Sequence, residues 1–111
     1  MSGKDRQVVT KILLEASLIS GLIDGLDLDA FANDEKTKRA VCMTLINIGE
    51  LVKILSEDFR LTYPDIPWRA IAGLRDVTAH RYQTLKMGDI WLTAKNDIPA
   101  MMNRLQEILE V

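Results

Sequence analysis

Residues 34–60 read DEKTKRAVCMTLINIGELVKILSEDFR, and this stretch decides the fold class. Its apolar side chains recur at steps of three and four, the spacing that places them along one side of an α-helix. This main stripe consists of Val41, Leu45, Ile48, Leu51, Val52, Leu55 and Phe59. A second apolar flank consists of Cys42, Met43 and Ile46. We predict a helix over about 34–60 that contacts more than one neighbour, within a bundle or across a subunit interface.

The segment before this stretch has the same spacing. Apolar side chains over about 4–25 predict an amphipathic helix, loosened near Gly21 and Gly25. The acidic connection DGLDLDAFANDEK follows. Within it, Asn33 or Asp34 can accept hydrogen bonds from the free N–H groups at the start of the next helix.

The hexapeptide YPDIPW interrupts the helical pattern after residue 62. Pro64 and Pro67 each lack an N–H donor and disfavour helix in the residue before them. Pro67 suits the first turn of a new helix, with Asp65 near its cap. We predict a short third helix over about 66–80.

The last predicted helix follows the break MGD at 87–89, with Asp89 as its cap. Pro99 lies inside its apolar pattern, which predicts a kink or two abutting helices. The apolar positions are Trp91, Ala94, Ile98, Met101, Met102, Leu105 and Leu109. The expected fold is one all-α domain over 1–111, an antiparallel bundle of four main helices.

Composition limits the classes of protein that fit. The chain has 111 residues, of which 48% are apolar and 27% charged, as expected for one small helical domain. We expect a cytoplasmic protein without a membrane span, because no apolar run is long enough and MSGKDRQVV does not resemble a signal peptide. One cysteine and one histidine are too few for an internal disulfide or a structural zinc site, and no cofactor is expected.

Charge is distributed unevenly along the chain. The net charge is −2, but residues 60–86 hold five basic residues against two acidic ones, a balance of +3 that leaves −5 for the remainder. Such asymmetry can mark an anion-binding face, although solvated surface arginines are the alternative. The candidates for RNA contact in this segment are Arg69, Arg81 and Lys86.

The segment LRDVTAHRY, residues 74–82, contains the single histidine, His80. On an ideal helix Arg75 and Tyr82 nearly eclipse each other, whereas His80 points about 140° away from Arg75. Arg75 and His80 would converge only if the helix ends near His80 or a second copy faces the first. Asp76 lies four residues before His80, on the same face, and could accept a proton from the imidazole.

An arginine and a histidine together suit phosphodiester chemistry. Arginine binds the phosphate and stabilises charge developing on its oxygens, and histidine transfers protons near neutral pH. Attack by the RNA 2′-hydroxyl needs no metal but benefits from a base and an acid. A two-fold dimer would supply two histidines. The alternative is a surface or capping histidine among salt-bridged arginines, with Tyr82 as a core aromatic.

The arrangement Arg75-x-x-x-x-His80-x-Tyr82 resembles the R-x-x-x-x-H-x-Y signature of HEPN-superfamily ribonucleases, in particular the HepT-like toxins. The resemblance extends over roughly 30–105 and includes FAND, NIGELVKIL, YPDIPWRAIAGLRD and the Pro99 pattern. It implies a homodimer of helical bundles whose motif lines a cleft at the two-fold axis and cuts RNA without a metal.

The same resemblance implies roles for individual residues. Arg75 and His80 would be the catalytic pair, with Asp76 as their polar neighbour. Toxins of this type are paired with a minimal nucleotidyltransferase antitoxin, which can silence them by transferring AMP to the motif tyrosine, here Tyr82. The toxin dimer could form a larger complex with that antitoxin. The alternative function is a non-catalytic module that binds a nucleotide or docks a nucleotidyltransferase.

Overall fold

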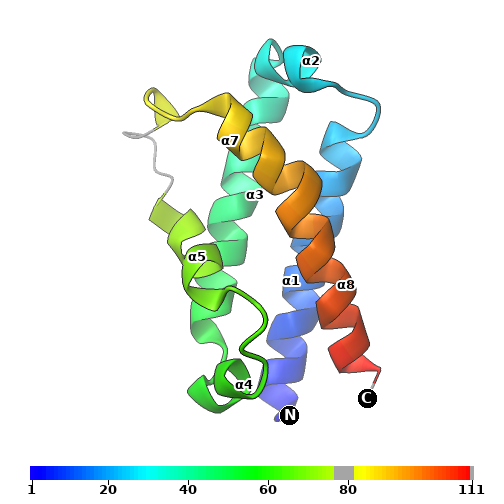
Figure 1. Cartoon of the computed structure of the whole chain (residues 1–111), viewed down its shortest axis with the longest axis vertical. Helices are drawn as coiled ribbons and strands as arrows, with labels where there is room; N and C mark the ends of the chain where they lie inside the picture. The colour runs from blue at the N-terminus through cyan, green and yellow to red at the C-terminus, as the bar shows by residue number, and fades with distance from the viewer. Residues whose placement is uncertain (77–81, 111) are drawn as a thin grey trace.

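The computed structural model describes residues 1–76 and 82–110, and for Arg75 and Asp76 it describes the backbone (Figure 1). All regular structure in these residues is helical, which confirms the all-α class. The elements are α1 (Gly3–Ile23), α2 (Leu28–Ala32), α3 (Glu35–Ile54), α4 (Glu57–Thr62), α5 (Trp68–Ala72), the 3₁₀ turn η1 (Gly73–Asp76), α7 (Met87–Leu92), the π-helical turn η2 (Thr93–Asp97) and α8 (Ile98–Leu109). None of the described helices is long and apolar enough to cross a bilayer.

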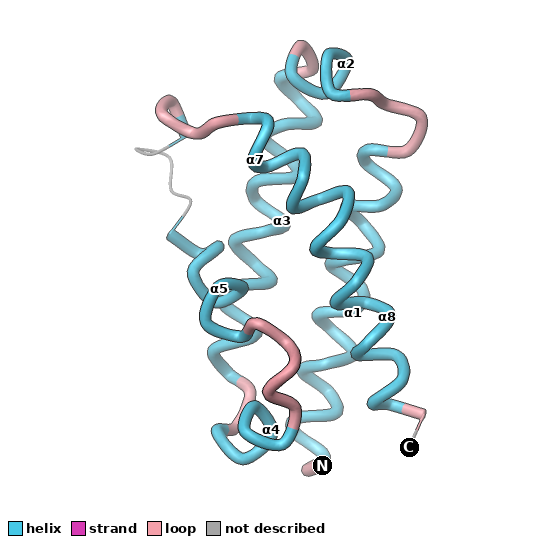
Figure 2. The backbone as a smooth tube through the Cα atoms, viewed as in Figure 1, coloured by secondary structure: helices cyan, strands magenta, loops and turns pink. Residues whose placement is uncertain are grey.

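The long helices pack side by side. α1 contacts both α3 and α8, while α5 and η1 pack on α3 (Figure 1). Asp5, near the start of α1, contacts Ser56, just after the end of α3, so these two helices run antiparallel. Short loops connect the helices, and both termini lie at the same end of the bundle (Figure 2).

The core is built from the apolar sides of these helices. Most of the predicted α3 stripe is buried, although Leu51 is only partly so. In the second flank Cys42 is buried, but Met43 is 58% exposed, so Met43 lies outside the core of this chain. The side chains without solvent exposure include Val9, Ile12, Ala16, Ile19, Val41, Leu45, Ile48, Val52, Ala94 and Leu105.

The predicted helix over 34–60 is two helices. α3 ends at Ile54, and Leu55 is extended, with φ −59° and ψ 142°. Ser56 then accepts a hydrogen bond from the Phe59 N–H at 3.1 Å and caps α4. The apolar stripe continues through Leu55 and Phe59, so the period alone did not reveal the break.

Helix starts follow local capping where a suitable side chain is present. Asp34 caps α3 by accepting from the Thr37 N–H at 3.1 Å, as predicted. Asp89 was wrongly predicted as a cap, because α7 begins earlier, at Met87, and Asp89 lies in its first turn.

The third helix starts differently from the prediction. Pro67 occupies the cap position before α5, and no side chain caps it. Asp65 lies two residues before this cap position, but its carboxylate pairs with Arg104 at 2.7 Å and does not cap the helix. The described part of the predicted helix 66–80 consists of α5 and η1, and residues 77–80 lie outside the description.

The helical pattern changes at Gly25 and near Pro99, whereas Gly21 does not interrupt its helix. α1 continues through Gly21 to Ile23, and Gly25 then adopts φ +77°, which glycine tolerates. The π-helical turn η2 separates α7 from α8, and Pro99 lies in the first turn of α8. Pro99 cannot donate to the carbonyl four residues earlier, so the widened turn accommodates the missing bond. The predicted interruption at Pro99 is confirmed.

The short helix α2 was not predicted. Asp27 caps it by accepting from the Ala30 N–H at 2.8 Å. Its Phe31 is fully buried, with its ring centroid 5.3 Å from that of Trp91 on α7. A single apolar anchor in five residues gives no periodic pattern, which is why the sequence did not indicate this helix.

Candidate active site and the tyrosine cluster

The two ends of the predicted motif both lie against α3. η1, which carries the backbone of Arg75 and Asp76, packs on α3 directly after α5. Tyr82 contacts the first turn of α3. His80 and Arg81 lie outside the described residues, so the distance between Arg75 and His80 stays untested.

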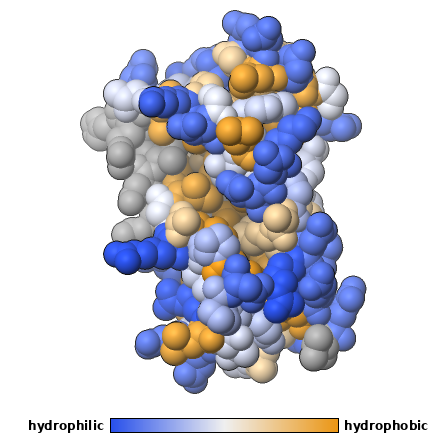
Figure 3. Space-filling model, in the orientation of Figure 1, coloured by the Kyte–Doolittle hydropathy of each residue, from blue (hydrophilic) through white to orange (hydrophobic). Residues whose placement is uncertain are grey.

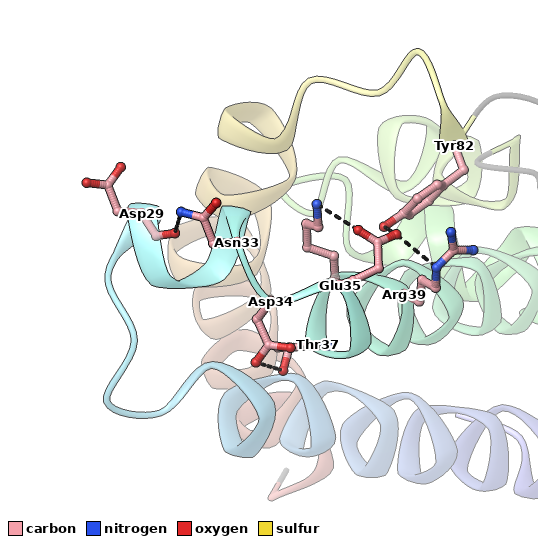
Figure 4. Close-up of polar contacts among 8 residues, drawn as sticks. Asp29, Asn33, Asp34, Glu35, Thr37, Arg39 and Tyr82 are labelled. Atoms are coloured by element: carbon pink, nitrogen blue, oxygen red, sulfur yellow. Dashed lines mark hydrogen bonds and ion pairs between the residues drawn. The ribbon is translucent and has the colours of Figure 1, made fainter.

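Tyr82 belongs to a polar cluster on the first two turns of α3 (Figure 4). Its hydroxyl donates to Glu35 Oε1 at 2.9 Å. Arg39 Nε donates to the same oxygen at 2.9 Å, and Lys38 Nζ pairs with Glu35 Oε2 at 3.0 Å. The Arg39 guanidinium carbon also lies 4.5 Å from the centre of the Tyr82 ring. One carboxylate therefore holds a phenol and two cations together.

Helix geometry accounts for the cluster. Residues three and four apart are neighbours on a helix, so Glu35 meets both Lys38 and Arg39. The start of α3 is fixed by Asp34, which accepts from the Thr37 hydroxyl at 2.7 Å as well as from its N–H. Tyr82 lies 47 residues after Glu35, so tertiary packing, and not helix geometry, brings it to this turn.

The cluster fixes the protonation states of its members. The hydrogen bonds from Lys38 and then from Tyr82 lower the pKa of Glu35 below its usual value. Burial and the Glu35 carboxylate raise the pKa of Tyr82 to about 12. At neutral pH Tyr82 is therefore a phenol that donates, and Glu35 is a carboxylate that accepts.

A basic depression lies between α3, α4 and α5, and it adds two cations to the sequence candidates. Lys53, Arg60 and Arg69 line it, with Glu57 as the acidic residue among its lining side chains. The buried Nε of Arg60 has no hydrogen-bond partner among the described residues. We refer to Lys53, Arg60 and Arg69 as the basic groove.

The geometry near this groove is set by Trp68. Its indole Nε1 donates to the carbonyl oxygens of Tyr63 at 2.9 Å and Arg60 at 3.2 Å, which ties α5 to α4. Arg69 follows on α5 and is exposed, and η1 continues the same chain toward Arg75. Lys86 is also exposed, at the start of α7. Arg69 therefore lies on the element that leads into the motif.

An apolar hollow of about 410 Å³ separates α5 from η2 and α8. Figure 3, which views the molecule from the side of α5 and α8, shows apolar surface at the centre of this face. Its lining includes Ile71 and Leu74 on one side and Met101 on the other. Its polar residues include Asp65 and Arg104, which form an ion pair with each other. The hollow offers shape but no unpaired acid–base couple, so it does not compete with the motif as the candidate reactive site.

Residues 12–108 match the protein family described as "Ribonuclease HepT-like". The chain belongs to this HepT-like ribonuclease family. The match covers the motif, α3 and the Tyr82 cluster, and it confirms the resemblance noted in the sequence.

Individual relatives agree with this assignment. The HepT-like chain is 36% identical over 111 residues to "Putative RNase MJ0127" of Methanocaldococcus jannaschii, which covers 99% of this chain and 92% of the relative. It is 33% identical over 105 residues to "Putative RNase TTE0752" of Caldanaerobacter subterraneus, covering 95% and 94%. It is 37% identical over 78 residues to "Probable ribonuclease HepT" of Thermococcus cleftensis, covering 70% and 71%. No solved structure gives a significant match.

Proposed function

We propose that this HepT-like chain is a toxin that cleaves RNA without a metal. Arg75 would bind the scissile phosphate, and His80 would transfer protons as the RNA 2′-hydroxyl attacks the adjacent phosphorus and the 5′-oxygen leaves. Asp76 would support the histidine. The observation that carries the proposal is the complete Arg75-x-x-x-x-His80-x-Tyr82 motif within a segment that matches the HepT-like family.

The proposal includes a homodimer, because one chain supplies one histidine for two proton transfers. An exposed apolar strip on α1 and α3 supports it. Leu14 of α1 and Asn47 of α3 line the same depression. Because the two helices run antiparallel, Leu18, four residues after Leu14, lies level with Met43, four residues before Asn47. Leu14, Leu18 and Met43 are 65%, 57% and 58% exposed. Exposed apolar side chains in one strip are typical of a protein interface.

We propose that RNA approaches the motif across the basic groove and the cations Arg69, Arg81 and Lys86, of which Arg69 and Lys86 are exposed. Lysine and arginine side chains bind the phosphate backbone without reading sequence. Arg69 belongs to both sets, and it stands on α5, directly before η1. The RNA would therefore bind on the side of the molecule where α5 continues into η1, the element that contains Arg75.

The proposed regulator is a minimal nucleotidyltransferase that acts as antitoxin and transfers AMP to Tyr82. The added phosphodiester would bring negative charge and bulk beside a phosphate-binding motif, and both would oppose RNA binding. Partial exposure of Tyr82 is compatible with access by a second protein. Toxin and antitoxin would form a complex larger than the dimer.

The decisive experiment is RNA cleavage by the purified protein in EDTA. We expect the wild type to cut and His80→Ala to lose activity by about 10²–10⁴-fold, the usual contribution of a proton-transfer group. For Arg75→Ala we expect a loss of about 10²–10³-fold, the usual contribution of a group that stabilises developing charge. Arg6→Ala, an exposed arginine on α1, is the matched control and should cut normally.

Three results would contradict the proposal. Equal cleavage by wild type and His80→Ala would exclude His80 as the proton-transfer group. Loss of wild-type cleavage in EDTA, with recovery on adding Mg²⁺, would exclude the metal-independent route. An inactive wild type that binds the nucleotidyltransferase tightly would favour the non-catalytic docking module.

A further inference from the structure

The Glu35 carboxylate occupies a position where three hydrogen-bond donors converge. The Tyr82 hydroxyl and Arg39 Nε both lie 2.9 Å from Glu35 Oε1, and Lys38 Nζ lies 3.0 Å from Oε2. A carboxylate and a phosphate present similar oxygens to such donors. The first turns of α3 therefore form an anion site that the protein fills with its own side chain (Figure 4).

This anion site lies beside the Tyr82 oxygen that would carry the phosphate. In a phosphate ester of Tyr82, the other oxygens on phosphorus lie closer to the phenol oxygen than Glu35 Oε1 does now, at 2.9 Å. Once the proton has been transferred, a phosphate on this side of the phenol oxygen would replace the Glu35 carboxylate. Lys38 and Arg39, which now bind Glu35, are two described cations close enough to bind the phosphate.

The charge of the cluster also favours this exchange. Lys38 and Arg39 against Glu35 leave one positive charge in excess. A phosphodiester carries a single negative charge, so its addition makes the cluster neutral. Among the residues that the structure describes, the Cys42 thiol also lies near Tyr82; it is buried and has a raised pKa because of that burial, so it contributes no charge at neutral pH.

We propose that Glu35, Lys38 and Arg39 form the acceptor subsite for adenylyl transfer to Tyr82, with Glu35 as the general base and the two cations as phosphate ligands. The inference rests on the proposed modification of Tyr82. It adds three α3 residues that the sequence did not single out for this role.

The step can be written with its atoms balanced. The Tyr82 oxygen bonds to the α-phosphorus of a nucleoside triphosphate held by the nucleotidyltransferase, the bond from that phosphorus to the bridging oxygen breaks, and pyrophosphate leaves with the electron pair. The phenol proton passes to Glu35, to which it is already hydrogen-bonded. Protonation removes the charge of Glu35, so Lys38 and Arg39 exchange the carboxylate for the new phosphate. Glu35 then returns its proton to water.

The unmodified cluster resists spontaneous reaction. Because the pKa of Tyr82 is raised to about 12, almost none of it is phenolate at neutral pH. A base within hydrogen-bond distance that accepts the proton during attack avoids the need for free phenolate. Glu35 meets that requirement.

The test follows AMP transfer from ATP by the purified nucleotidyltransferase, using intact mass under single-turnover conditions. For Glu35→Gln we expect a loss in rate of about 10²-fold or more, as for other general bases. For Lys38→Ala and Arg39→Ala we expect about tenfold losses each, as for a lost hydrogen bond to a charged group. Glu50→Gln and Lys36→Ala, both exposed on α3, are the matched controls and should react at the wild-type rate.

The pH profile separates a base from a structural residue. Wild-type transfer should change little between pH 7 and 9, because Glu35 has a low pKa and is fully ionised there. Transfer to Glu35→Gln should rise about tenfold per pH unit, because it would depend on free phenolate. A flat profile for Glu35→Gln, or wild-type rates for all three variants, would overturn the inference while leaving Tyr82 modification intact. A wild-type chain that gains no AMP, or gains it away from Tyr82, would overturn the modification itself and the inference with it.

Discussion

Asp5 and Ser56 join the start of α1 to the start of α4. The Asp5 carboxylate accepts from the Ser56 N–H at 2.9 Å and from the Ser56 hydroxyl at 2.6 Å. Only 4% of Asp5 is exposed. The same Ser56 hydroxyl oxygen caps α4. This contact fixes the break after α3, and with it the position of α4 and the YPDIPW connection that leads to the motif.

We expect Asp5→Ala to lower the free energy of unfolding by about 1.5–3 kcal/mol, the usual contribution of hydrogen bonds to a charged group. The substitution would remove both hydrogen bonds that the Ser56 N–H and hydroxyl donate to the buried Asp5 carboxylate. Urea unfolding followed by circular dichroism measures the change. Asp24→Ala, at the exposed end of α1, is the control and should change stability little; an equal loss in both variants would contradict the role of Asp5.

The contribution of Asp5 should depend on pH. Burial alone would raise its pKa, but the hydrogen bonds from Ser56 and Ser2 outweigh burial and lower it. A lowered folded-state pKa means that the stabilisation is complete above the ordinary value of 3.8 and is lost as the pH falls through the lowered value. The stability difference between wild type and Asp5→Ala should therefore be constant near neutral pH and shrink in acid.

We expect Tyr82→Phe to retain RNA cleavage and to lose AMP addition. The ring can still lie against Arg39, but the acceptor oxygen is gone. Mass spectrometry after coexpression with the nucleotidyltransferase measures the modification, and RNA cleavage measures the activity. Tyr63→Phe is the matched control, and it should gain AMP as the wild type does. AMP addition to Tyr82→Phe would contradict the assignment.

We expect substitutions in the basic groove to weaken RNA binding in a salt-dependent way. Each phosphate contact removed should reduce the slope of log K against log salt by about 0.7 for single-stranded RNA. Arg60→Ala and Arg69→Ala are the test variants, and RNA titrations at several salt concentrations give the slope. Arg6→Ala should keep the wild-type slope, and an unchanged slope in the groove variants would exclude RNA contact there.

We expect Leu18→Glu and Met43→Glu to shift the proposed dimer toward monomer. Each places a charge in the exposed strip of α1 and α3, where a partner would have to bury it. Sedimentation velocity over a range of protein concentrations measures the shift. Leu92→Glu is the control, because Leu92 is similarly exposed, at 55%, but lies on α7. A wild type that sediments as a monomer would contradict the homodimer.

The sequence by itself determined the helical class, most of the α3 core stripe, the Asp34 cap and the interruption near Pro99. These features depend on contacts within three or four residues or on one residue's own chemistry, so they are visible in a linear pattern. The residues of the motif were visible in the same way. Their roles came from the resemblance to a family.

The tertiary structure decided what the linear pattern could not. Residue 56 became a helix start because Asp5, 51 residues away, holds it there. The segment of α3 that contains Glu35, Lys38 and Arg39 reads as ordinary helix salt bridges until Tyr82, 47 residues after Glu35, is brought against it. Hydrogen bonds between distant segments depend on where whole helices pack, and helical periodicity specifies only which face of each helix is buried.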